Sequence, residues 1–295
     1  MTVSERVYVR IDCSDVLSFF EFIKSMKPRD WAFRGHAKFA EGEVGDWKLE
    51  STLSRFLRTH QRKINAATSW YPRERDQVNR FRESAHSHLV HLPAEKDVLS
   101  WLALMQHYGA PTRLIDFTFN PMVALFFALR DAGPQTGAFS IHALHIDTVR
   151  GRAQSVRKAL AEYSAVTPPL NPMPREYCVG AKPKPVDFVG FFDGSQLNPR
   201  QENQEGLFMV PSRIDLDVEK WLHKYLSPNK TIKPHNAAWV EFVFPNQTTT
   251  YYECVQQMLQ AGMTAKRLFP GLEGICESMK YSWFLSPKNL KTADR

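Results

Sequence analysis

Apolar residues recur at three- and four-residue spacing in several stretches of the chain, a pattern typical of amphipathic helices. One such helix is predicted to run from Val98 and to end at Gly109, because glycine favours the backbone conformation that follows a helix. The next helix is predicted to begin with Asn120 as its cap and Pro121 as its first residue. Further helices are predicted at residues 14–27, where Ser14 is the cap, and at 51–91, 155–163, 215–226 and 251–259. Pro72 is expected to interrupt the helix predicted at residues 51–91.

Alternating apolar and polar residues predict strands at residues 7–11, 31–34, 138–144, 186–192, 207–210 and 239–244. The strand at 31–34 is followed by glycine and is expected to present Arg34 at its end. Strands and helices do not alternate regularly, and the sequence has no internal repeat. This pattern favours an α+β fold, with a mainly antiparallel central sheet and flanking helices, over a doubly wound parallel sheet.

The length of 295 residues is sufficient for one large domain or two modest ones. We expect a single domain across residues 1–295, with a helical insertion at about residues 51–95. Six prolines between Pro168 and Pro185 predict a long loop at about residues 165–185.

The composition, with 43% hydrophobic and 12% aromatic residues, is that of a folded protein. The longest apolar run, Met122 to Leu129, is far shorter than the roughly 20 residues that span a bilayer. Charged residues interrupt the first ten positions, so no signal peptide is expected. The four cysteines are widely spaced and are interpreted as reduced thiols. We therefore expect a soluble, cytoplasmic protein that does not engage a membrane.

The formal charge of +7 favours a polyanionic partner, since a basic surface attracts phosphate at long range. The densest basic cluster consists of Arg58, Arg62, Lys63, Arg73, Arg75, Arg80 and Arg82. Three acidic residues, Glu74, Asp76 and Glu83, lie among them. A solvated helix face is therefore favoured over a nucleic-acid patch.

Common catalytic and cofactor motifs are absent: the sequence has no Gly-x-Gly-x-x-Gly, Gly-x-x-x-x-Gly-Lys, His-Glu-x-x-His or Gly-x-Ser-x-Gly. His86, His88 and His91 are the one histidine cluster that suggests a metal. On a helix His88 and His91 share a face but His86 does not, and Glu95 lies beyond Pro93. We therefore predict no metal site.

The segment Gln106 to Leu129 places several polar side chains between two helix signals, which is how a site is often built. His107 could transfer a proton, and Tyr108 could stack on a ligand. Alternatively, Gln106 and His107 satisfy backbone groups of the following turn and Tyr108 fills the core. Arg113 and Asp116 could bind a ligand or form an internal salt bridge. Thr118 could also serve only as a helix-capping residue.

Arg34 carries a fixed charge and a planar donor fork that suits phosphate or carboxylate. Gly35 has no side chain and would allow a ligand to approach closely. The alternative for Arg34 is a structural ion pair with Asp116. Further along, Glu202 and Gln204 stand just before a predicted strand, where they could reach a sugar hydroxyl or lie in a solvated turn.

Several motifs together resemble the FRG-domain proteins, which occur mainly in bacteria and phages and are named for the tripeptide Phe33-Arg34-Gly35. The most specific motif is the Gln106 segment, and Arg200-Gln-Glu-Asn-Gln-Glu-Gly-Leu-Phe208 is of intermediate specificity. The resemblance extends from the helix near Ser14 to Leu268-Phe-Pro-Gly-Leu-Glu-Gly-Ile275. It thus covers most of the chain.

The order of these motifs is similar to that of the three-part NAD site of ADP-ribosyltransferases. The resemblance implies that Arg34 holds the phosphates or ribose of NAD, and that Thr118 supports the nicotinamide pocket. A final glutamate would orient the ribose and stabilise the oxocarbenium-like transition state. Here the corresponding loop reads Glu202-Asn203-Gln204, whereas such transferases usually present Gln-x-Glu or Glu-x-Glu.

The leading hypothesis is an ADP-ribosyltransferase-like enzyme that uses NAD to modify a protein or nucleic acid, as a toxin or antiphage effector. Its predicted catalytic residues are Arg34, His107, Glu202 and Gln204. Its predicted NAD-binding residues are Arg34, Gly35, Gln106, Tyr108, Arg113, Asp116 and Thr118. The alternative is a non-catalytic module that senses a nucleotide or nucleic acid through Arg34, Arg113 and Tyr108.

Overall fold

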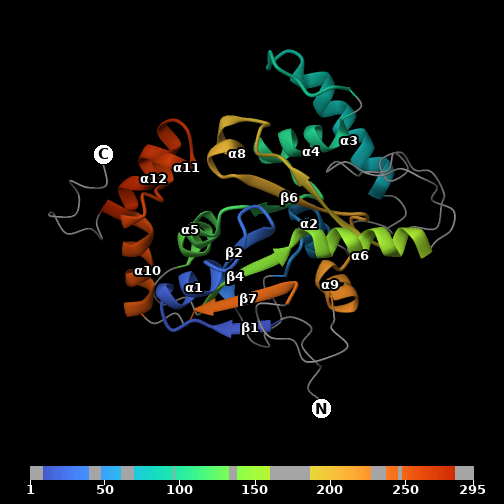
Figure 1. The fold of residues 1–295 in the computed structure, drawn as a ribbon. Helices are drawn as coiled ribbons and strands as arrows, with labels where there is room; N and C mark the ends of the chain where they lie inside the picture. Colours follow the sequence, from blue (N-terminus) through green and yellow to red (C-terminus); the bar gives the residue numbers. More distant parts are fainter. Residues whose placement is uncertain are drawn as a thin grey trace.

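A computed structural model describes residues 9–39, 48–60, 70–95, 97–132, 138–159, 187–226, 237–244 and 248–282. Its centre is a seven-stranded sheet with the strand order β1-β7-β4-β2-β3-β6-β5 (Figure 1). The strands are β1 (Val9–Asp12), β2 (Trp31–Phe39), β3 (Ile115–Thr118), β4 (Ala138–His145), β5 (Val189–Asp193), β6 (Gly206–Pro211) and β7 (Trp239–Phe244). Mixed strands and helices in irregular order confirm the α+β class.

The sheet is mixed, although most of its neighbouring strands are antiparallel. Strand β1 runs parallel to β7 at one edge, with Val9 opposite Val240. Nearly the whole chain separates these two strands, so no hairpin fixes their relative direction. The prediction of a mainly antiparallel sheet therefore holds for the centre, and the β1 edge departs from it.

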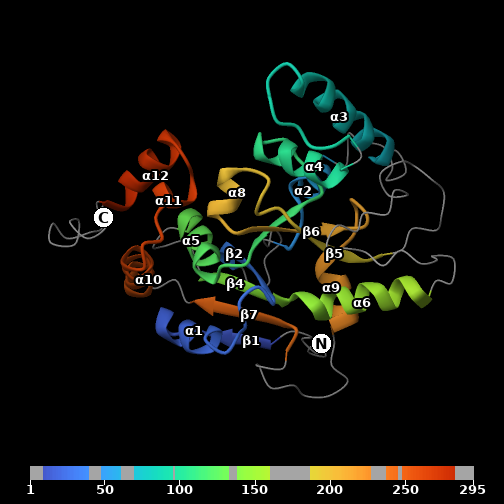
Figure 2. The ribbon, with the colours of Figure 1, turned by 45° about the horizontal axis from the view of Figure 1, so that its top comes forward.

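Eleven helices are described around this sheet. They are α1 (Val16–Ile23), α2 (Thr52–Thr59), α3 (Trp70–Ala85), α4 (Val98–His107), α5 (Pro121–Asp131), α6 (Ile146–Ala159), α8 (Pro199–Asn203), α9 (Val218–Leu226), α10 (Thr248–Gln260), α11 (Ala265–Leu268) and α12 (Leu272–Ser282). Helices α1, α5 and α10 lie on one side, α6 and α9 on the other, and α3 and α4 near β6 (Figures 1 and 2).

Three apolar clusters join these helices to the sheet. Phe19 of α1 and Phe126 of α5 belong to the first cluster, with Phe242 of β7. Trp221 of α9 packs in the second cluster with residues of β3 and β5. The third joins Val78 of α3 to α4 and to β6. The sheet is therefore covered on both faces, and a buried strand such as β7 has no exposed side.

The caps around the central segment are as predicted. Gly109 follows α4 with a φ of 88°, a conformation that glycine adopts without strain. The Asn120 side chain accepts a hydrogen bond from the Met122 amide at 2.9 Å, and Pro121 is the first residue of α5. At α1, however, Asp15 and not Ser14 is the cap, because its Oδ1 accepts from the Ser18 amide at 2.7 Å.

Several predicted boundaries were wrong. Helix α3 begins close to Pro72 and is not interrupted by it, since proline is tolerated in a first turn. Helix α6 starts at Ile146, earlier than the predicted Ser155. The polar stretch 193–204 contains the short helix α8. Residues 7–8, 61–69, 160–163 and the proline-rich stretch 168–185 lie outside the described residues.

Strands β2 and β3 meet at one point and then separate. Within the described chain they pair through Phe33 and Thr118, whereas β2 pairs with β4 from Trp31 to Phe39. Arg34 therefore lies in the middle of β2 and not at its end, but it is the first residue beyond the contact with β3. This divergence in a continuous sheet creates the space for a site.

Candidate functional site

A cavity of about 240 Å³ opens where β2 and β3 separate. Residues of β2, β3, α5 and α8 and the end of α4 line it. Seven of the predicted site residues are among them: Arg34, Gly35, Gln106, His107, Asp116, Thr118 and Gln204. Segments that are far apart in the sequence thus supply one pocket.

The Arg34 side chain bridges the two separating strands. Its Nη1 donates to the backbone oxygen of Asp116 at 2.6 Å, and its Nε donates to Nε2 of His36 at 3.0 Å. The predicted structural partner, the Asp116 carboxylate, is therefore replaced by the Asp116 carbonyl. A guanidinium has five N–H donors, and no other hydrogen bond joins the Arg34 guanidinium to residues that the structure describes. Donors thus remain for a ligand.

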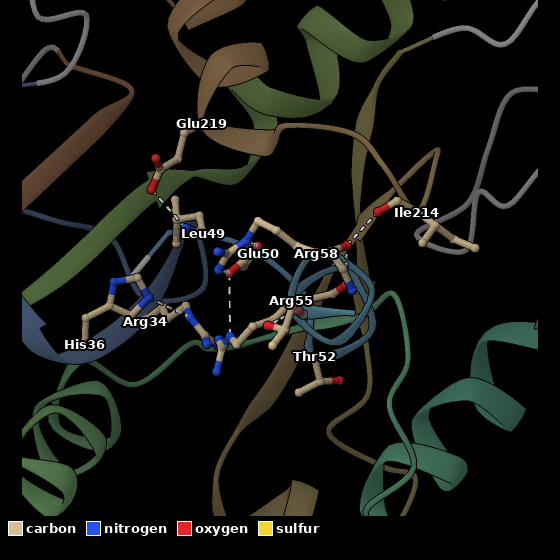
Figure 3. Close-up of polar contacts among 12 residues, drawn as sticks. Arg34, His36, Leu49, Glu50, Thr52, Arg55, Arg58, Ile214 and Glu219 are labelled. Carbon is tan, nitrogen blue, oxygen red and sulfur yellow. Dashed lines mark hydrogen bonds and ion pairs between the residues drawn. The ribbon is translucent and has the colours of Figure 1, made fainter. Parts of the chain in front are cut away.

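A second positive charge lies beside Arg34. Figure 3 shows the side chain of Arg55, from α2, directed toward that of Arg34, with Glu50 at 3.6 Å from Arg55 Nε. Burial lowers the pKa of Arg34, Asp116 counteracts this effect, and Arg55 lowers that pKa further. Because arginine has an intrinsic pKa above 12, Arg34 stays charged at neutral pH. An anion bound here would relieve the repulsion between the two guanidinium groups.

A buried row of polar residues supports Arg34 across the sheet. Arg34 pairs with His142 on β4, and His142 pairs with Glu241 on β7. The His142 ring lies edge-on to that of His36, with centroids 4.8 Å apart. Its Nε2 is 3.6 Å from Oε1 of Glu241. Residues directly opposite one another share a face, so this row lies on one side of the sheet.

Hydrogen bonds assign the tautomers of these two histidines. His36 accepts from Arg34 at Nε2, so a neutral His36 carries its proton on Nδ1. His142 accepts from Trp239 Nε1 at Nδ1, at 3.2 Å, so its proton is on Nε2 and faces Glu241. Burial lowers the pKa of His142 to about 3, and the charge of Arg34 contributes. Burial also lowers the pKa of His36 well below 6.5, aided by His142, Arg34 and Arg55.

Gln106 positions the Asp116 carboxylate. Its Nε2 donates to Oδ1 of Asp116 at 2.6 Å, and its Oε1 accepts from the hydroxyl of Thr112. The Thr112 hydroxyl in turn accepts from the Leu114 amide at 3.1 Å. The interpretation of Gln106 as a partner for turn backbone groups is therefore wrong. Thr112 of the turn thus fixes the Gln106 side chain, and Gln106 fixes the carboxylate of Asp116, which lines the cavity.

His107 and Tyr108 have different surroundings. His107 lines the cavity, and its Nδ1 is buried without a hydrogen-bond partner among the described residues. Burial and the charge of Arg200 lower the pKa of His107, and Glu273 raises it. Tyr108 stacks edge-on against His107 at 5.0 Å but is 58% exposed and does not line the cavity. The alternative place of Tyr108 in the core is wrong, and its ligand role stays a prediction.

Arg113 is not part of the cavity. It is fully buried and forms a two-point ion pair with Glu74 of α3, in which Nε lies 2.8 Å from Oε1. Its Nη1 also donates to the backbone oxygen of Ser212 at 3.1 Å. The predicted salt bridge between Arg113 and Asp116 is wrong, because the Arg113 side chain extends from the turn toward α3.

The segment at residues 202–205, which precedes β6, provides an amide and no carboxylate to the cavity. Gln204 lines it and donates from Nε2 to the Leu268 carbonyl at 3.2 Å. Glu202 is exposed on α8 and is not among the residues that line the cavity. Glu205 has a φ of 46°, and its Oε1 accepts from Asn120 at 2.7 Å. Thr118 donates to the Gln204 carbonyl at 2.7 Å, which joins β3 to this segment.

Gly35 has a structural reason to be glycine that the sequence interpretation missed. A Cβ at Gly35 would lie 2.0 Å from the Ala124 carbonyl oxygen and 2.7 Å from the Ala128 amide nitrogen. Both atoms belong to the backbone of α5. The missing side chain therefore lets α5 pack closely on β2, which requires glycine here whether or not a ligand also approaches it.

Three polar residues that line the cavity were not predicted: His36, Arg200 and Gln201. His36 follows Arg34 by two positions on a strand and so shares its face, a signal that alternation could have given. Arg200 lies with its guanidinium 4.6 Å above the Phe269 ring. The aromatic residues Phe33, Phe117 and Phe127 complete an apolar part of the wall.

The described ranges of the chain contain no group of three or more His, Cys, Asp or Glu side chains that could hold a metal ion. No helix in them is both long and apolar enough to cross a membrane.

Comparison with known proteins identifies one family. Residues 29–136, which include Arg34, Asp116 and Thr118, match the family model of the FRG domain. No curated protein and no solved structure matches the chain. The seven-stranded sheet extends beyond the matched segment, through β4 to β7. Residues 29–136 are therefore similar to the FRG domain, as the FRG tripeptide and the Gln106 segment predicted, and the match ends before the predicted motifs at Arg200 and Leu268.

Proposed function

We propose that this protein is an ADP-ribosyltransferase-like enzyme that binds NAD in the β2–β3 cavity and modifies a protein or nucleic acid. The observation that carries the proposal is that Arg34, Thr118 and Gln204 line one cavity. They come from three segments, on or next to the adjacent strands β2, β3 and β6. Their order in the sequence is that of the three-part NAD site. A role as a toxin or antiphage effector belongs to the same proposal.

The residues present fit a dinucleotide. Arg34 and Arg200 offer cationic donors to phosphate, and Phe127 offers an apolar surface to a flat ring. The buried His107 Nδ1, which has no partner within the described chain, fits a ligand hydrogen bond. A volume of about 240 Å³ is below the roughly 300–1,000 Å³ of pockets that enclose a drug-sized ligand. We therefore expect the cavity to hold one nucleoside end of NAD.

The roles follow from the side chains. The remaining donors of Arg34 would bind a phosphate, and the neutral His36 would keep that guanidinium fixed. Thr118 would shape the floor through its bond to the Gln204 carbonyl. NAD supplies an activated glycosidic bond, with nicotinamide as the leaving group. The protein would orient that bond, exclude water and accept the proton of the acceptor.

A second function, binding without transfer, is favoured by one observation. Gln204 presents an amide in the segment where such transferases usually carry a glutamate, and Glu202 is directed to solvent. A protein of this kind would sense a nucleotide or nucleic acid and release no product. Salt-sensitive binding of nucleic acid with no consumption of NAD would support it.

The test is the transfer of label from NAD, labelled in its adenylate half, to the protein and nucleic-acid fractions of a cell extract. We expect label in one fraction with the wild type and none with Arg34→Ala. Arg150→Ala is the matched control, since Arg150 forms an ion pair on α6 with Asp147 and does not line the cavity. Absence of label with the wild type, at NAD concentrations that saturate binding, would favour the sensing module.

A further inference from the structure

We propose that Asp116 is the catalytic carboxylate of this pocket, in place of a glutamate from residues 202–205. The inference rests on the proposed function and names the group that accepts the proton in it. Asp116 lies on β3, next to the point at which β2 and β3 separate. Among the lining residues that the structure describes, it is the one with a carboxylate.

Neither glutamate of residues 202–205 lines the cavity. Glu202 is exposed on α8 and does not line the cavity. Glu205 accepts from the Asn120 side chain and helps to hold the start of α5. Gln204 reaches the cavity but cannot accept a proton as a carboxylate does. Residues 202–205 therefore supply no carboxylate to the cavity.

Asp116 is held in a defined orientation. Gln106 donates to its Oδ1 at 2.6 Å, and Thr112 fixes the other end of the Gln106 amide. The backbone oxygen of the same residue accepts from Arg34 at 2.6 Å. One residue thus presents its carbonyl to Arg34 and its carboxylate to Gln106. No hydrogen bond from the described chain is made to Oδ2, which leaves this oxygen available to a substrate.

The transfer of ADP-ribose from NAD to an acceptor needs no further reagent. The bond between C1′ of the nicotinamide ribose and the ring nitrogen breaks, and its electron pair leaves with nicotinamide. A hydroxyl or amine of the acceptor forms a new bond to C1′ and gives its proton to the Asp116 carboxylate. Asp116 then releases the proton to solvent. With water as the acceptor, the same step gives ADP-ribose and nicotinamide.

The test compares Asp116→Asn with Glu202→Gln. Asparagine keeps an oxygen that can accept from Gln106, so the first substitution removes the charge and the proton acceptor while preserving shape. The second makes the same chemical change at an exposed position of α8. Four quantities are measured for each protein: nicotinamide release, label transfer, the Kd for NAD and the Tm.

We expect Asp116→Asn to reduce nicotinamide release and transfer by at least about 100-fold, a typical contribution of a general base. The Kd for NAD and the Tm should change little, because neither the Gln106 contact nor the Arg34 contact is lost. Glu202→Gln should retain the wild-type rates. A loss confined to turnover would identify Asp116 as a catalytic residue and not a structural one.

Two outcomes overturn the proposal in distinguishable ways. If Asp116→Asn keeps the wild-type rate of nicotinamide release, or Glu202→Gln alone loses it, Asp116 is not the proton acceptor and the transferase assignment stands. If the wild type binds NAD but releases no nicotinamide, the proposed function and this inference both fail.

Discussion

Arg34 donates from Nη1 to the backbone oxygen of Asp116 across the point where β2 and β3 separate. In a regular antiparallel pair, main-chain amides would make this connection. A side chain makes it here, so the strands can diverge and still be held at a fixed distance. The same guanidinium faces the cavity, and it therefore links the stability of the split sheet to the binding of a ligand.

Replacing Arg34 should weaken ligand binding and also lower the stability of the fold. Arg34→Ala should weaken NAD binding at least tenfold. It should also lower the free energy of unfolding by about 1–3 kcal/mol, the usual contribution of hydrogen bonds to a charged group. Calorimetric titration with NAD and urea unfolding measure the two effects, with Arg150→Ala as the control. A protein that loses several kcal/mol but binds NAD normally once folded would show that Arg34 is structural only.

Gly35→Ala should destabilise the fold by overpacking. The new Cβ would meet the α5 backbone at 2.0 Å, and relieving this overlap requires a shift of α5 that we expect to cost about 1–3 kcal/mol. The matched control is Gly151→Ala in α6, where a Cβ meets no described atom outside its own helix within 4 Å and alanine favours the helix by about 0.5–1 kcal/mol. Urea unfolding compares both variants with the wild type. Equal stability of the two variants would contradict the close packing of α5 on β2.

Glu74→Ala should be one of the most destabilising single substitutions in the chain. It removes the carboxylate that pairs with the buried Arg113 guanidinium, and breaking a buried ion pair from one side typically costs about 3–5 kcal/mol. Asp76→Ala, two positions further along α3 and at an exposed site, should change stability by less than about 0.5 kcal/mol. Chemical unfolding tests the difference. A small effect at Glu74 would mean that Arg113 finds another partner.

Stability should fall as the solution becomes more acidic than pH 6.5. The unfolded chain protonates its histidines near that pH, whereas folding lowers the pKa of His142 to about 3 and that of His36 in the same direction. Between these values the unfolded state binds more protons, so each histidine removes up to about 1.4 kcal/mol of stability per pH unit as pH falls. Above pH 6.5 this contribution is constant.

Conservative variants test the origin of that slope. His36→Gln offers an oxygen to Arg34 where the ring offered Nε2, and His142→Asn offers one to Trp239 where the ring offered Nδ1. Urea unfolding between pH 7.5 and 4.5 should show a shallower pH dependence in both variants. The His36→Gln protein should also keep its affinity for NAD, whereas His36→Phe, which has no acceptor, should lose it. An unchanged slope in the double variant would assign the acid sensitivity to carboxylates.

Local features of the fold could be predicted from the amino-acid sequence alone. Helix α4, its Gly109 terminus and the Asn120–Pro121 start of α5 follow from the periodicity of apolar residues and from capping chemistry, both of which act over a few residues. Strand β7 was predicted with its observed bounds, because it alternates and is flanked by turn residues. The FRG tripeptide and the Gln106 segment also predicted the match of residues 29–136 to the FRG-domain model.

Contacts between distant residues, in contrast, follow from the packing of the whole chain. The pairing of Arg113 with Glu74 spans 39 positions, and that of Arg34 with the Asp116 carbonyl spans 82. No periodicity encodes such contacts, because they depend on how elements pack and on which strand ends its pairing early. The candidate polar residues could be named from the sequence, but their positions could not. Asp116 lines the cavity next to the point where β2 and β3 diverge, whereas Glu202 lies at the surface on α8.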